Sequence, residues 1–131
     1  MNKNYAERDK IIFGKYEPDS YFGGCRRFTC SKEVMQELIE KNFIDPDECQ
    51  NCSPSTKEFM EYIENIDDVR LNCYAISPLR DDYRITIEGL DVEIADDNYD
   101  MISYLVETFH YADEFSFEHN GDSYFLHAWW D

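Results

Sequence analysis

Residues 69–94 read VRLNCYAISPLRDDYRITIEGLDVEI, and this stretch decides the fold of the chain. Apolar and polar side chains alternate through most of it, which is the period of a strand with one buried face. The alternation is found in three segments, 69–75, 83–87 and 90–94. A turn at 78–82 and the residue Gly89 separate them, because proline and glycine interrupt regular strands. We therefore expect three half-buried strands of an antiparallel sheet.

The chain that follows predicts one helix and one hairpin. The helix is expected to begin at Asp97 or Asn98, because both residue types cap helix N-termini. The dipeptide Asn120-Gly121 then stands between two apolar segments. It predicts a hairpin, since both residues tolerate the positive φ of a type I′ turn.

The chain before residue 69 predicts two more helices. Ser31 and Ser55 are candidate N-caps, and Glu58 follows Ser55 at the spacing of a capping box. The first 30 residues are less regular, and residues 11–13 are a candidate for a short strand.

These elements predict the α+β class, with a mixed or antiparallel twisted sheet of about five strands and about three helices packed on one face. Residues 1–131 are expected to form a single domain, since this length suits one domain rather than two. The chain is 43% hydrophobic and 16% aromatic, which is enough apolar surface for a core and argues against disorder. The residues expected to be buried together are Leu71, Ile85, Ile87, Val92, Leu105, Val106, Phe109 and Phe117.

Charge is the most informative feature of the composition. The formal net charge is −17, and residues 61–131 hold 18 acidic side chains against 3 basic ones. Direct binding to nucleic acid needs clustered lysine and arginine, so this acidic half argues against it. No apolar run is long enough to span a membrane or to serve as a signal peptide, and we expect a cytoplasmic protein.

The acidic half leads to our first hypothesis, a small protein-binding module that occludes a basic site on a partner. Nuclease inhibitors, immunity proteins and nucleic-acid mimics act in this way, because a carboxylate array attracts a basic surface over long range. Four strand residues are expected on the open face of the sheet: Glu88, Asp91, Glu93 and Glu118. Three more are expected to rim it: Asp96, Asp97 and Asp100. Trp129 is the candidate exposed anchor, and solubility alone is the alternative explanation of the charge.

Four cysteines form the basis of a second hypothesis. Cys25 and Cys30 are separated by four residues, Cys49 and Cys52 by two, and such close pairs are typical of zinc sites. A zinc-stabilised or metal-dependent protein is therefore the alternative function. The segments around the cysteines lack the usual glycine, so we expect no stoichiometric zinc and no cofactor.

No catalytic motif is found. The sequence has no G-x-S-x-G, no H-E-x-x-H, no P-loop and no dinucleotide fingerprint. A binding protein is consequently a better interpretation than an enzyme.

Overall fold

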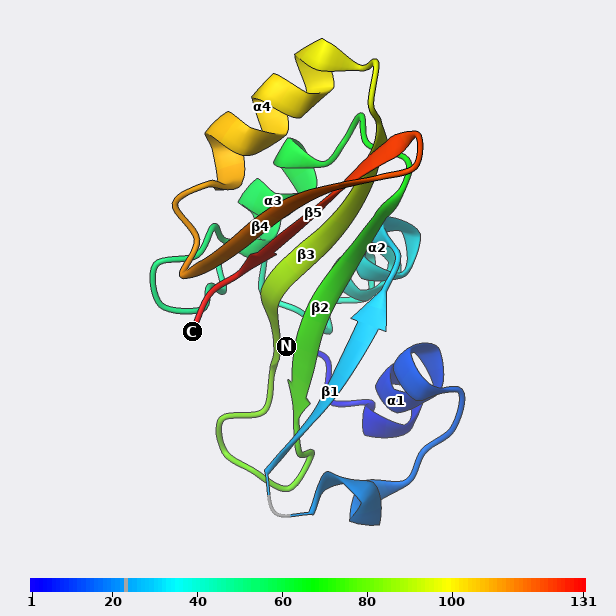
Figure 1. The fold of residues 1–131 in the computed structure, drawn as a ribbon. Coiled ribbons are helices and arrows are strands. Elements are labelled where there is room, and N and C mark those ends of the chain that lie inside the picture. The colour runs from blue at the N-terminus through cyan, green and yellow to red at the C-terminus, as the bar shows by residue number, and fades with distance from the viewer. Residues whose placement is uncertain (23) are drawn as a thin grey trace.

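The computed structural model describes residues 1–22 and 24–131 and contains a five-stranded antiparallel sheet in the order β1-β2-β3-β5-β4 (Figure 1). The strands are β1 (Cys25–Cys30), β2 (Val69–Ile76), β3 (Ile85–Ala95), β4 (Glu114–Asn120) and β5 (Ser123–Trp129). The helices are α1 (Tyr5–Phe13), α2 (Lys32–Glu40), α3 (Thr56–Tyr62) and α4 (Tyr99–Phe109), with a short 3-10 helix η1 (Pro18–Tyr21). No helix in these residues has the length and apolarity needed to cross a bilayer.

The helices pack on one face of the sheet and enclose the core, so the predicted α+β architecture is confirmed (Figure 1). Six of the eight predicted core residues are buried, and Phe117 packs half-buried against them. Val106 is the exception, because it is half-buried and does not belong to the core. Leu105 and Phe109 lie four residues apart and face the sheet, which turns Val106 to the side of the helix.

The predicted helix starts are also confirmed. Ser31, Ser55 and Asn98 each accept a hydrogen bond from the backbone N–H three residues further on. The Glu58 carboxylate accepts from the Ser55 backbone N–H, which completes the capping box.

β3 runs unbroken through Gly89, where two strands were predicted. The pairing with β2 shifts at Asn72 and Cys73, and Glu88 is the extra residue of a β-bulge. A Cβ atom on Gly89 would lie 2.2 Å from the Ala128 carbonyl oxygen of β5. Glycine therefore permits the close approach of β3 and β5 instead of ending the strand.

The predicted strand at residues 11–13 is wrong, because these residues belong to α1. A buried polar network anchors this helix. The Arg8 guanidinium donates to Asp9 Oδ1 (3.0 Å), the Tyr21 hydroxyl (2.7 Å) and the Ile76 carbonyl (3.1 Å). The Tyr21 hydroxyl donates to the Asp9 carboxylate at 2.7 Å, and burial raises the pKa of Tyr21, so the phenol stays protonated.

The β4–β5 hairpin is confirmed, but its turn lies one residue later than predicted. Asn120 pairs with Ser123, so the two turn residues are Gly121 and Asp122. Gly121 has φ +66°, and a two-residue hairpin with glycine at the first turn position is a common alternative to the type I′ turn.

Candidate functional site on the open face of the sheet

A row of aromatic side chains lies on the open face of β5. Phe125, His127 and Trp129 are alternate residues of this strand, so they share the face that the helices leave uncovered. The residues between them, Leu126 and Ala128, are buried in the core on the other side. Phe125 is 41% exposed, while His127 and Trp129 are half-buried.

Carboxylates flank this row on both sides because of the strand register. Glu93 of β3 and Glu118 of β4 lie opposite Phe125. Neighbouring strands are about 4.8 Å apart, so each carboxylate stands next to the aromatic ring. Asp91 lies opposite His127, and Glu114 lies opposite Trp129. The open face thus presents an aromatic row between two lines of negative charge.

Asp91 is held in place by two neighbours. Its Oδ1 atom is 2.7 Å from His127 Nδ1, and its Oδ2 atom accepts from the Asn72 side-chain amide at 2.8 Å. These contacts connect β2, β3 and β5 across the open face. They also fix the His127 ring beside Trp129, with 6.4 Å between the ring centroids.

Three of the predicted binding residues meet in one hollow of about 330 Å³. Asp91, Glu93 and Glu118 line it together with Phe125 and His127. Asp68 adds a fourth carboxylate, and Arg70 is the cation among the lining residues. The local charge is therefore negative, as we expected for this face.

Glu88 lies on the open-face side of the sheet, in a hollow with Trp129, but its predicted exposure is wrong, because the residue is only 2% exposed. The bulge sets Glu88 beneath Arg27, whose Nε donates to Glu88 Oε1 at 3.2 Å. Burial raises the pKa of Glu88, and the Arg27 guanidinium opposes this effect.

The three predicted rim residues do not extend the acidic hollow. Asp96 pairs with His119 at 3.0 Å, and His119 alternates with the open-face residues of β4. Asp97 is exposed in the turn before α4. Asp100 lines a different hollow, between α3 and α4 on the helix-covered side, together with Tyr104.

The two tryptophans near the end of the chain lie on opposite sides of the sheet. Trp130 is buried in the core, where its ring packs against Phe59 at 5.4 Å between centroids. Trp129 lies on the open face, and its indole Nε1 donates to Asp131 Oδ1 at 3.1 Å.

The four cysteines do not form a metal site. Cys25 and Cys30 stand at opposite ends of β1 and face opposite sides of the sheet. Five strand residues span about 17 Å, far more than a tetrahedral zinc site allows. Cys49 and Cys52 lie exposed in the loop before α3. Within residues 1–22 and 24–131, no three Cys, His, Asp or Glu side chains are grouped to hold a metal ion.

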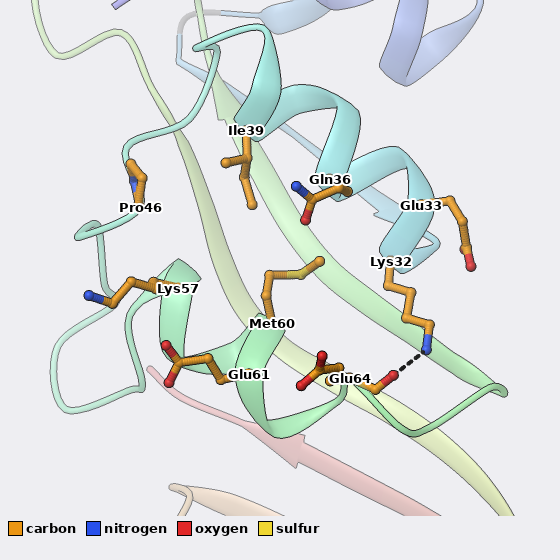
Figure 2. Close-up of a pocket in the computed structure, with 9 residues that line it drawn as sticks. All are labelled: Lys32, Glu33, Gln36, Ile39, Pro46, Lys57, Met60, Glu61 and Glu64. Atoms are coloured by element: carbon orange, nitrogen blue, oxygen red, sulfur yellow. Dashed lines mark hydrogen bonds between the residues drawn. The ribbon is translucent and has the colours of Figure 1, made fainter.

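A further hollow of about 480 Å³ lies between α2 and α3 (Figure 2). Ile39 and Met60 supply apolar surface between the two helices. Lys32 donates to the carbonyls of Ile63 (3.4 Å) and Glu64 (3.1 Å), at the C-terminal end of α3. The lining contains two lysines and three glutamates, so its charge is mixed and selects no partner clearly.

Sequence reasoning missed Phe125 and His127 as members of the site. Alternation along β5 places both on one face with Trp129, and this signal was present in the sequence. No model of a known protein family matches the chain, and comparisons with curated proteins and with solved structures also give no match.

Proposed function

We propose that this protein binds a basic segment of a partner protein along the open face of its sheet. The observation that supports this function is the aromatic row of β5 between the carboxylates of β3 and β4. A lysine or arginine side chain can lie over an aromatic ring and pair with the adjacent carboxylate, and both contacts favour a cation.

The spacing along β5 suits an extended segment. Alternate residues of an extended chain are about 6.8 Å apart, and Phe125, His127 and Trp129 are alternate residues of one strand. A segment with a basic residue at every second position would therefore meet one ring after another. Its other side chains would point to solvent.

Binding of this kind would occlude a basic surface on the partner. Nuclease inhibitors and immunity proteins are the functional class that this describes, because nucleases bind phosphate backbones through basic residues. The net charge of −17 adds long-range attraction, which speeds association with such a partner.

The proposal is tested with an acetylated and amidated seven-residue peptide of alternating arginine and threonine, titrated into the labelled protein and followed by NMR. We expect saturable shifts at Phe125, His127 and Trp129. Replacing Glu93 and Glu118 together by Gln should weaken binding about fivefold, since each exposed ion pair contributes about 0.5 kcal/mol.

The matched control replaces Glu61 and Glu64 by Gln. These exposed residues lie on the helix-covered side of the sheet, and the substitution changes the net charge by the same amount. The control variant should bind the peptide with nearly the parent affinity. Equal weakening by both pairs would show that total charge alone attracts the peptide, and absence of saturable binding would refute the proposed function.

A further inference from the structure

A second hollow on the open face, of about 340 Å³, surrounds Glu88 and Trp129. The Glu88 side chain is only 3% exposed, and its Oε2 atom has no hydrogen-bond partner among residues 1–22 and 24–131. A buried carboxylate oxygen without a donor is costly, because it has lost water and gained nothing in exchange. The hollow therefore contains an unused acceptor with a strong preference for a charged donor.

The charges around Glu88 are not balanced. Asp131 also lines the hollow, and Arg27 is the cation that faces these two carboxylates. The Arg27 Nε donates to Glu88 Oε1, and the Arg27 side chain is 71% exposed. One further positive charge would bring the hollow to neutrality.

Trp129 gives the hollow an aromatic wall. Its indole N–H is fixed by Asp131 Oδ1, and the Arg27 Cζ atom lies 5.8 Å from its ring centroid. A planar guanidinium stacks on tryptophan and donates through several N–H groups, while an ammonium is a compact and strongly hydrated charge. The combination of a carboxylate acceptor and an indole wall favours arginine over lysine.

We infer that this hollow is a subsite for an arginine side chain of the bound segment, which donates to Glu88 Oε2 and stacks on Trp129. The inference rests on the proposed function, because it assigns one residue type of the partner to one place on the open face. Arg27 keeps its bond to Glu88 Oε1, and the incoming guanidinium supplies the second cation.

The test uses two acetylated and amidated pentapeptides with a single central arginine or its neutral isostere citrulline. Binding is followed by the NMR signal of the Trp129 indole N–H. We expect the arginine peptide to shift this signal saturably and to bind at least about fivefold tighter than the citrulline peptide, as for a charged hydrogen bond. Glu88→Gln should reduce that preference to about twofold or less. Glu61→Gln, on the helix-covered side of the sheet, should leave it unchanged.

Trp129→Leu provides a second variant that keeps Glu88 and removes the aromatic wall. It should weaken binding of the arginine peptide about fivefold, the magnitude of a partly desolvated cation–π contact. Binding to this variant and to the parent is compared through the backbone amide signals of β5, because the variant lacks the indole signal. If Glu88→Gln and Trp129→Leu both bind as the parent does, the subsite is refuted. The alternating peptide and the Glu93 and Glu118 variant test the proposed function separately. The arginine subsite can therefore be refuted while the proposed function is supported, and the reverse.

Discussion

Replacing Gly89 by Ala tests the packing that shapes the open face. The new Cβ atom would lie 2.2 Å from the Ala128 carbonyl oxygen, 3.1 Å from Trp129 Cα and 3.2 Å from the Ala128 carbonyl carbon. All three are backbone atoms of β5, so no side-chain rotation can relieve the contact. The two strands must separate until the shortest of these distances exceeds 3.0 Å.

The cost of this separation has two parts. Forcing an extra methyl group into a packed position costs about 1–3 kcal/mol. Opening the strands also weakens ladder hydrogen bonds at about 1 kcal/mol each, including the bond from the Trp130 N–H to the Glu88 carbonyl at 2.9 Å. We therefore expect Gly89→Ala to lower the free energy of unfolding by about 3–5 kcal/mol.

Urea denaturation followed by tryptophan fluorescence measures this loss. The control is Gly121→Ala in the hairpin turn, where φ is +66° and a Cβ atom would meet nothing within 4 Å. That variant should lose only the conformational preference of glycine, about 1–2 kcal/mol. If Gly89→Ala costs no more than Gly121→Ala, the close approach of β3 and β5 at Gly89 is wrong.

Four further predictions follow from individual contacts. Leu105→Ala should lower the free energy of unfolding by about 2–5 kcal/mol in the same assay, because Leu105 is fully buried on the sheet-facing side of α4. A loss below about 1 kcal/mol would contradict this. Since burial raises the pKa of Glu88, the folded protein holds that proton more tightly than the unfolded chain does. Stability should therefore fall as the pH rises above 4.5, and Glu88→Gln should make this fall shallower in thermal melts from pH 4 to 7. Lys32→Met keeps the aliphatic part of the side chain but removes the ammonium from the end of α3, and should cost about 1 kcal/mol in urea; an unchanged midpoint would argue against the contact in Figure 2. Elemental analysis of protein purified without added metal should show no stoichiometric zinc, and one zinc per chain would restore the metal hypothesis.

Local signals predicted much of the fold. Alternation in 69–94 predicted the central strands, and the spacing of Ser55 and Glu58 predicted a helix start that the structure shows. These signals depend on near neighbours in the chain, which are visible in one sequence. α1 and β1 were missed because their residues are stabilised by distant segments. The Arg8 contact to Ile76, 68 residues away, is an example.

The candidate site was only partly predictable for the same reason. The outward positions of Asp91, Glu93 and Glu118 follow from strand period alone. Their meeting with Phe125 requires the pairing register of β3, β4 and β5, which no local pattern specifies. The burial of Glu88 depends on the bulge in β3 and on Arg27 of β1, which covers it, and no local pattern specifies either.

The buried network of Arg8, Asp9 and Tyr21 has a consequence for the evolution of this chain. Loss of Arg8 or Asp9 leaves the other as an unpaired buried charge and costs about 3–5 kcal/mol. Loss of the Tyr21 hydroxyl leaves both without a hydrogen-bond partner and costs about 1–3 kcal/mol. Apolar replacement of a whole buried ionic group, in contrast, is often neutral or stabilising. Single substitutions at these positions should therefore be deleterious intermediates, and we expect the three residues to be inherited together. Natural variants that share the fold should carry all three or none, so the three positions should covary although Tyr21 lies 12 residues from Asp9.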